Sequence, residues 1–393
     1  MIDYHLLLSV LIGVSILIIL ILKFKIQPFL GLLISSILVG ILAGVAPLEI
    51  MNTVKEGMGS TLGFVAVVVG LGAMFGAILE HSGGAEALAQ YLLKAFGEKN
   101  ASWALMITGF FIAIPVFFDV AFIILIPLVY SLQRKTKKSI LLYAIPLLAG
   151  LAITHAFIPP TPGPVAVADI LNADLGWVIL VGFIVGIPTA IVSGPIFGKF
   201  IASKIFIAAP KKIDEKVVDN FPPIRLILSI IATPILLIVL NTLLNSPLGS
   251  GLNLSDKTIT WLQMIGHPFS ALIIANLMAW YLLGIRRGVS KAILSKITSA
   301  SLAPAGIIIL LTGAGGVFKQ MLITTGTGEM LANYFSSIGL SVLLFSFLAA
   351  VCVRILQGSS TVAMITAAGI TSSLITTPLS EFHTALIVIS IAA

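Results

Sequence analysis

Long runs of apolar residues, separated by short polar segments, occupy most of the chain. A helix of roughly 20 apolar residues is long enough to cross the hydrocarbon core of a membrane. The run from Leu6 to Leu22, interrupted only by Ser and Gly, is of this kind. The pattern therefore predicts an all-α polytopic membrane protein. The apolar runs fall at about 4–22, 26–46, 60–80, 101–133, 139–170, 177–200, 225–244, 267–284, 301–320, 340–376 and 382–393.

Two of these runs differ from the others in length and continuity. The runs 101–133 and 340–376 are too long for one crossing and too short for two comfortable ones. Each is also broken near its middle, at Pro115–Asp119 and at Arg354–Ser360. We interpret both as re-entrant hairpins that enter and leave the membrane on the same side.

An internal repeat accompanies the two hairpins. An offset of 243 residues aligns similar stretches, each of which directly precedes a broken hairpin. Repeats of this kind are common in secondary transporters. We therefore expect two inverted-topology repeats, each with a re-entrant hairpin and a broken helix. The identical pairs are Gly72 and Gly315, Phe75 and Phe318, Gly83 and Gly326, Glu86 and Glu329, Leu88 and Leu331, Ala89 and Ala332, and Tyr91 and Tyr334.

The second repeat is expected to be incomplete. The first hairpin is followed by a helix that is broken at Ile158–Pro164, and the counterpart of this break would fall beyond Ala393. We therefore expect a C-terminally truncated sequence. The predicted organisation is a membrane half at 1–200, a cytoplasmic linker at 201–224 and a truncated membrane half at 225–393.

Composition agrees with the apolar pattern. Of the 393 residues, 59% are hydrophobic and 9% are charged, whereas soluble domains carry about 25% charged residues. This leaves no room for an additional soluble domain. The net charge of +7 is better explained by basic membrane loops than by binding of nucleic acid. Cys352 is the one cysteine of the sequence, which excludes an intrachain disulfide and a cysteine metal cluster.

The basic residues predict the orientation in the membrane. If both hairpins are re-entrant, almost all of the 22 Lys and Arg residues fall on one side, which should be cytoplasmic. The N-terminus then lies outside, the hairpins enter from opposite faces, and the protein is a multi-pass protein of a cell membrane, as in a bacterial inner membrane. The exceptions are Lys55, Lys257, Lys319 and Arg354.

Three breaks in the apolar helices are the candidate site. Broken backbone within a bilayer is tolerated only where it lines a polar cavity or is buried in protein. The N-terminus of a half-helix suits a carboxylate, and unwound carbonyls suit cations. The breaks are Pro115–Asp119, His155–Pro164 and Arg354–Ala363. We expect them to form a pocket of backbone dipoles and hydroxyl groups.

Titratable side chains accompany two of the breaks. Asp119 lies between apolar segments, where a charge is costly and usually functional. His155 has an ordinary pKa close to neutrality. We therefore predict that Asp119 and His155 couple transport to protons. The alternative for Asp119 is that it caps a half-helix, and for His155 that it is a core residue. For Asp169, a further acidic residue, we favour a place at the outer end of its helix.

Polar groups at the breaks are candidates for binding a substrate. Thr161 and Gly163 lie in a segment whose prolines prevent a regular helix. Arg354 has the geometry to pair with a carboxylate, although it could instead form an ion pair or reach the interface. The second hairpin adds neutral hydrogen-bonding groups and a flexible glycine at Gln357, Gly358, Ser359, Ser360 and Thr361.

Motifs for other functions are missing from the sequence. The string Gly194–Lys199 is one residue too short for a P-loop, and no His-Glu-x-x-His is present. The sequence therefore predicts neither an enzyme nor a cofactor or metal site. A membrane-embedded enzyme and a channel remain as alternatives from other classes, and single-channel currents would identify the latter.

At the three breaks the chain resembles a known family. Gly109–Asp119, His155–Pro164 and Gln357–Ala363 are similar to the gluconate permease (GntP) family of gluconate:proton symporters, within the ion transporter superfamily. In that group, hairpin tips and broken helices bind the substrate, and a transport domain moves against a dimeric scaffold. The resemblance implies a homodimer and places Phe118 and Asp119 at the first hairpin tip.

The resemblance and the residues together predict a secondary transporter. We expect it to import gluconate or a related sugar acid with protons by alternating access. The alternative is a sodium-coupled carrier of another small carboxylate. The predicted partners are a small anion, protons and the lipid bilayer, with no nucleic acid. The expected substrate-binding residues are Phe118, Thr161, Gly163, Arg354, Gln357, Gly358, Ser359, Ser360 and Thr361.

Overall fold

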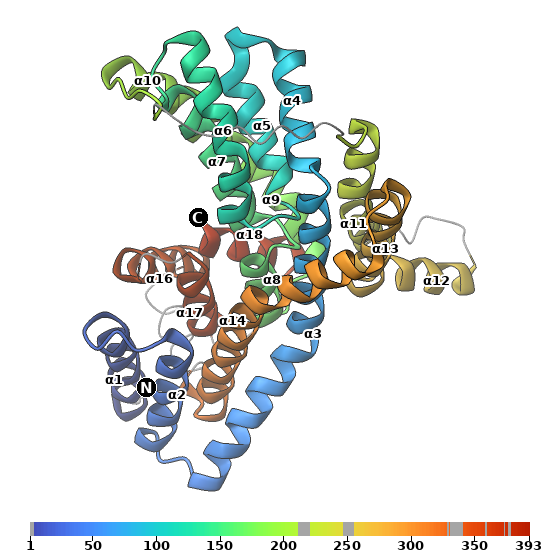
Figure 1. The fold of residues 1–393 in the computed structure, drawn as a ribbon. Helices are drawn as coiled ribbons and strands as arrows, with labels where there is room; N and C mark the ends of the chain where they lie inside the picture. Colours follow the sequence, from blue (N-terminus) through green and yellow to red (C-terminus); the bar gives the residue numbers. More distant parts are fainter. Residues whose placement is uncertain are drawn as a thin grey trace. The chain divides into compact units, whose positions relative to one another are not determined.

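The computed structural model describes residues 4–210, 221–246, 255–327, 330, 341–357, 360–372, 374–375 and 379–393, and these form helices and no strands (Figure 1). The α-helices are α1 (Tyr4–Leu22), α2 (Pro28–Leu42), α3 (Pro47–His81), α4 (Gly84–Phe96), α5 (Ala101–Ile112), α6 (Phe118–Thr136), α7 (Leu141–Phe157), α8 (Pro162–Ile170), α9 (Leu175–Ile191), α10 (Phe197–Lys204), α11 (Ile224–Asn245), α12 (Asp256–Gly266), α13 (Pro268–Ala279), α14 (Lys291–Thr324), α16 (Val342–Gln357), α17 (Ser360–Ser372) and α18 (Glu381–Ala392).

Seven helical stretches among the described residues are long and apolar enough to cross a membrane. Two of them join neighbouring helices, α7 with α8 and α9 with α10. The prediction of an all-α polytopic membrane protein is confirmed. The stretches are Tyr4–Leu22, Pro47–His81, Leu141–Ile170, Leu175–Lys204, Ile224–Asn245, Pro268–Arg287 and Lys291–Thr324.

The helices group into two compact units, and each combines distant parts of the chain. The first unit consists of Met1–Val69, Pro162–Val178 and Pro304–Ala393. The second unit consists of Gly70–Thr161 and Ile179–Ala303. The chain passes between the units within α3, at the start of α8, within α9 and within α14. The membrane halves at 1–200 and 225–393 were predicted from the repeat in the sequence rather than from packing. They therefore remain a prediction.

The two longest helices follow the offset found in the sequence. Helices α3 and α14 have 35 and 34 residues, and their last residues, His81 and Thr324, are 243 positions apart. Each is followed two residues later by a left-handed glycine, Gly83 with φ of 74° and Gly326 with φ of 71°. The matched pairs that involve Glu329, Leu331, Ala332 and Tyr334 lie outside the described residues.

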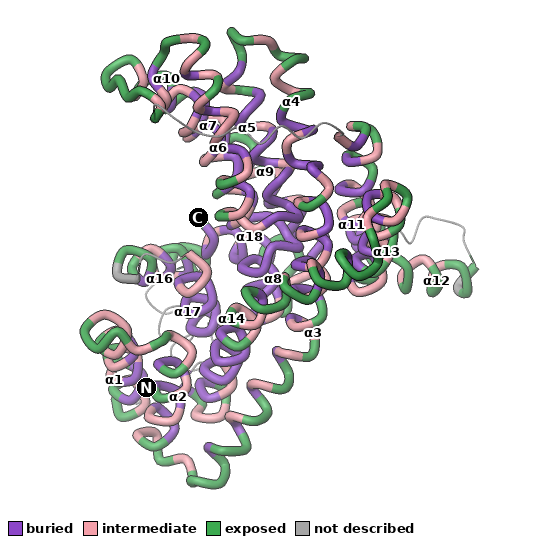
Figure 2. The backbone as a smooth tube through the Cα atoms, viewed as in Figure 1, coloured by how far each residue is buried: buried purple, intermediate pink, exposed green. Residues whose placement is uncertain are grey.

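Close backbone contact between α3 and α14 holds the first unit together. A Cβ atom on Gly57 would lie 2.8 Å from the Gly316 carbonyl oxygen, and one on Gly316 would lie 2.7 Å from the Gly57 oxygen. Small residues permit this approach, which drives helix packing in lipid. Helices α8 and α17 form the buried centre of the unit (Figure 2), where every α8 residue except Asp169 is buried.

The second unit is built on the pair α5 and α7. A Cβ atom on Gly109 would lie 2.6 Å from the Leu147 oxygen, and one on Gly150 would lie 2.2 Å from the Met106 oxygen. Because these neighbours are backbone atoms, the two helices pack at the shortest distance that glycine allows. Helix α9 packs onto the end of α7, since a Cβ atom on Gly182 would lie 2.7 Å from the Phe157 oxygen.

Candidate functional site

The first predicted hairpin is broken where the sequence indicated. Helix α5 ends at Ile112, α6 begins at Phe118, and the five residues between them form a turn. With 12 residues, α5 has a length of about 18 Å, which is short of the roughly 30 Å of a bilayer core. The segment 101–133 is therefore not a continuous spanning rod.

The helix after the hairpin is also broken as predicted. Helix α7 ends at Phe157 and α8 begins at Pro162. The Thr161 hydroxyl donates a hydrogen bond of 2.6 Å to the Ile158 carbonyl oxygen, and the Thr161 amide donates to the same oxygen at 3.3 Å. Thr161 therefore closes the break, and its hydroxyl oxygen remains an acceptor for a further hydrogen bond.

Helix α3 holds the hairpin turn and the helix break together within the second unit. A Cβ atom on Gly76 would lie 1.9 Å from the Pro115 oxygen, and one on Gly72 would lie 3.4 Å from the Pro160 oxygen. These glycines are one helical turn apart on the same face of α3. One glycine face thus positions both irregular segments.

His155 lies beside the start of α6. Its ring is 6.4 Å from the ring of Phe117 and 6.5 Å from that of Phe118, measured between centroids. Its Nδ1 atom is buried and has no hydrogen-bond partner among the described residues. The charge of Asp119, in the first turn of α6, acts on the imidazole. The two predicted proton-coupling residues are therefore neighbours.

Asp119 is exposed, whereas the turn before it is buried from Ala113 to Val116. Its carboxylate lies at the N-terminus of α6, where backbone N–H groups and the helix dipole favour negative charge. No side chain caps this helix end. The arrangement thus places a carboxylate and the His155 ring at the same end of α6.

The remaining predicted site residues lie in the first unit. A Cβ atom on Gly163 would lie 2.4 Å from Cε of Met364, so the start of α8 packs directly on α17. Ser360 and Thr361 are half-buried at the start of α17. Arg354 is exposed, and its Nη1 atom donates to the Ala392 oxygen at 3.4 Å. The Gln357 side chain, Gly358 and Ser359 lie outside the described residues.

The structure adds a charged pair that sequence reasoning missed. Asp169 and Lys319 are both half-buried, and their charges interact. The Lys319 ammonium also donates a 2.5 Å hydrogen bond to the carbonyl oxygen of Ile170, the last residue of α8. A cation is favourable at this helix end. The sequence signal was a lysine inside a long apolar helix, which usually has a partner or a function.

Comparison with known proteins gives consistent results. The family described as GntP family permease matches residues 5–393. A gluconate permease of Pseudomonas aeruginosa is 37% identical, over 94% of this chain and 82% of that protein. A low-affinity gluconate transporter of Escherichia coli is 39% identical, over 91% and 80%. The inner membrane permease YgbN of Escherichia coli is 39% identical, over 92% and 81%.

A solved structure resembles the fold. The crystal structure of the Alcanivorax borkumensis YdaH transporter, described as having an unusual topology, aligns with a TM-score of 0.56 at 16% sequence identity. The alignment covers 86% of this chain and 76% of that one. At this identity the likeness concerns the fold alone.

Proposed function

The chain belongs to the GntP family of permeases, and from this we propose that it is a secondary active transporter for gluconate or a related sugar acid. Relatives that are 37% and 39% identical over most of the chain are named a gluconate permease and a gluconate transporter. The family consists of transporters and is not known to be enzymatic. The substrate would be a small anion taken up by a multi-pass membrane protein.

Proton coupling is the finer part of the proposal. The observation that carries it is the contact of the His155 ring with Phe117 and Phe118 at the uncapped start of α6, beside Asp119. The amides of α6 attract the substrate carboxylate, and Asp119 with His155 takes up the proton. A monoanion moving with one proton carries no net charge, so uptake would respond to the pH gradient more than to voltage.

Alternating access completes the proposed mechanism. A site built on interrupted helices at the interface of two repeats can open to either side when one part moves against another. The repeats would enter the membrane in opposite orientation, with the N-terminus outside, and the carrier would work as a homodimer. The equal offset of α3 and α14 and of the glycines that follow them supports the repeat.

The second candidate is a sodium-coupled carrier of another small carboxylate. It is favoured by hydroxyl groups at the start of α17, where Ser360 and Thr361 are half-buried. Hydroxyl and carbonyl oxygens are ligands that suit a sodium ion.

Uptake into proteoliposomes tests both candidates. Radiolabelled gluconate should accumulate when the outside is acidified, and a protonophore should abolish accumulation. Replacement of sodium by choline should leave uptake unchanged, and a potassium diffusion potential should have little effect. Uptake that requires sodium and ignores the pH gradient would favour the second candidate, and absence of gluconate uptake in either gradient would reject the first.

A further inference from the structure

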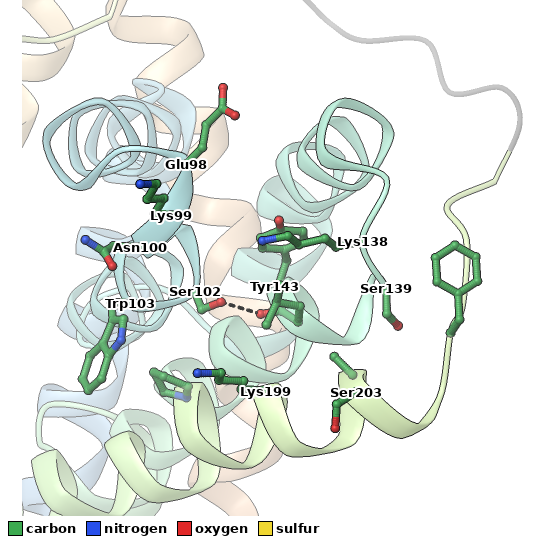
Figure 3. A pocket seen from close by; sticks show the side chains of 14 residues that line it. Glu98, Lys99, Asn100, Ser102, Trp103, Lys138, Ser139, Tyr143, Lys199 and Ser203 are labelled. Carbon is green, nitrogen blue, oxygen red and sulfur yellow. Dashed lines mark hydrogen bonds between the residues drawn. The ribbon is translucent and has the colours of Figure 1, made fainter.

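The second unit contains a basic cavity that the proposed transport mechanism does not use. It has a volume of about 680 Å³ and lies between the starts of α5 and α7 and the helix α10 (Figure 3). Lys99, Lys138 and Lys199 line it from three different segments. We propose that this cavity binds the phosphate-bearing headgroup of an anionic phospholipid.

The charge of the cavity favours an anion. Glu98 is the acidic residue in its lining, and its carboxylate forms an ion pair with Lys135. The three lysines that line the cavity therefore contribute an excess of positive charge. Asn100 adds a neutral hydrogen-bonding group, whereas the Ser102 and Ser203 hydroxyls already donate to the carbonyl oxygens of Leu142 and Phe200. A compact ammonium group is a point charge that suits phosphate oxygens.

Hydrogen bonds between separate segments hold the walls in place. The Ser102 hydroxyl donates 2.8 Å to the Leu142 oxygen and so links the starts of α5 and α7. The Ser139 hydroxyl donates to the Ile205 oxygen at 2.8 Å and accepts from the Ile207 amide at 3.2 Å. The start of α7 is thereby fixed to the segment after α10. The cavity is part of the folded unit rather than a gap between loose loops.

Apolar residues beside the cavity identify the ligand as a lipid. The helical stretch of α9 and α10 is long and apolar enough to span a membrane, and its outer face is exposed at Val192, Ile196 and Phe200. Trp103, a residue type typical of membrane interfaces, is in the lining and 37% exposed. Acyl chains can lie along this face while the headgroup occupies the cavity, as in other basic pockets between membrane helices.

The membrane side on which the cavity is predicted to lie also favours an anionic lipid. The lysines of the cavity belong to the basic segments whose positive charge assigns them to the cytoplasmic face. Anionic lipids give that leaflet a negative surface potential, and each nearby basic residue adds to the attraction. A free phosphate ion would use the lysines but would gain nothing from the apolar face.

Lipid retention by the full chain tests the proposal. The protein is reconstituted in nanodiscs of phosphatidylcholine with a minor fraction of cardiolipin, and bound lipid is counted by native mass spectrometry. We expect cardiolipin to be retained selectively. The triple variant K99Q/K138Q/K199Q should bind it roughly a hundredfold more weakly, from the usual contribution of three lysines.

A charge-matched control separates the cavity from general attraction. Lys94, Lys291 and Lys296 are exposed lysines of the second unit that do not line the cavity. The variant K94Q/K291Q/K296Q should retain cardiolipin as the wild type does. Equal retention by both triple variants, or equal loss in both, would overturn the proposal.

A further arm distinguishes a lipid from a soluble anion. Excess inorganic phosphate should not displace cardiolipin from the wild type. If phosphate displaces it, and phosphate binding itself depends on Lys99, Lys138 and Lys199, the cavity is a soluble-anion site and the lipid assignment is wrong. Lipid counting needs no transport substrate, so its outcome is independent of the proposed transport of gluconate.

Discussion

At the scale of single residues, Asp119 and His155 carry the chemistry proposed for this protein. Asp119 is exposed at the start of α6, and its charge acts on a histidine whose Nδ1 atom is buried without a partner among the described residues. The exposed Asp119 side chain is not needed for packing of the hairpin turn, which is buried through Ala113–Val116, whereas the His155 ring packs beside Phe117. Substitution of Asp119 can therefore test function with little loss of fold.

The first prediction concerns Asp119→Asn. The amide keeps the shape of the side chain but takes up no proton at working pH. Uptake driven by a pH gradient should therefore fall by roughly a hundredfold, the lower end of the usual contribution of a positioned proton-transfer group. Exchange of gluconate without a gradient should persist. Glu56→Gln removes an exposed carboxylate of α3 and should leave both activities unchanged. Undiminished proton-driven uptake in D119N would remove Asp119 from the mechanism.

The second prediction concerns the pair Asp169 and Lys319. Either Asp169→Asn or Lys319→Met leaves one half-buried charge without its neighbour, so each should lower the unfolding temperature in detergent. The double variant removes both charges and should be more stable than the sum of the two losses predicts. Residues in one charged network typically show coupling of about 0.5–3 kcal/mol. Strictly additive losses would mean that the two charges do not stabilise each other.

At the scale of elements, glycine positions decide how the helices support the site. The face of α3 that carries Gly72 and Gly76 approaches backbone atoms of Pro160 and Pro115. At Gly76 an added Cβ atom has no space, because the Pro115 oxygen 1.9 Å away is a backbone atom and cannot move aside as a flexible side chain can. Along the same helix, Gly63 is exposed, and a Cβ atom added to it would meet no other atom within 4 Å.

These two environments give the third prediction. Gly76→Ala should displace the hairpin turn, destabilise the protein by about 1–3 kcal/mol and abolish uptake. Gly63→Ala should instead stabilise the helix by about 0.5–1 kcal/mol and leave uptake intact. Thermal unfolding in detergent and gluconate uptake measure the two effects. Equal behaviour of the two variants would show that α3 does not hold the turn in place.

The sequence predicts the helix breaks better than the helix lengths. Prolines indicated the turn near Pro115 and the break near Pro160, because a proline inside a helix removes a backbone hydrogen bond. The apolar run at 60–80 covers only part of the length of α3, which begins at Pro47. Hydropathy identifies the part that suits lipid, and residues such as Lys55 and Glu56 continue the helix without interrupting its backbone hydrogen bonds.

Contacts between distant segments could not be predicted from the pattern. Lys319 donates to a carbonyl group 149 positions away, and no periodicity in either helix encodes that pairing. Thr161 was expected as a binding residue, and its hydroxyl donates to Ile158 to close the break. Local sequence indicates where backbone groups lose their partners, but the side chain that replaces each partner depends on the packed fold.

At the scale of the whole molecule, each unit takes its parts from both halves of the chain. The first unit combines Met1–Val69 and Pro162–Val178 with Pro304–Ala393, and the second unit combines Gly70–Thr161 with Ile179–Ala303. The chain crosses between units inside α3 and again inside α14, the two helices related by the sequence offset. Passage between the units inside both offset-related helices is what two equivalent repeats would produce, and it supports the proposed repeat.

The fourth prediction tests the orientation that the charge distribution implies. In a background with Cys352→Ser, we expect Lys94→Cys to react with a membrane-impermeant maleimide only in inside-out vesicles, and Lys257→Cys only in intact cells. Both positions are exposed, so reaction depends on the side of the membrane rather than on burial. We expect this pattern because the positive-inside rule places Lys94 on the cytoplasmic side with most of the basic residues, whereas Lys257 falls on the opposite side.

The pattern of labelling also reports on the hairpins and on the basic cavity. Reversed labelling of both positions would place the N-terminus inside and move the lysine cavity to the outer face, away from the leaflet whose negative surface potential favours the proposed lipid site. Labelling of both from one side would contradict opposite placement of the two segments and with it the inverted repeat. Labelling of the two positions from opposite sides is compatible with hairpins that enter from opposite faces, and only the expected pattern also agrees with the positive-inside rule.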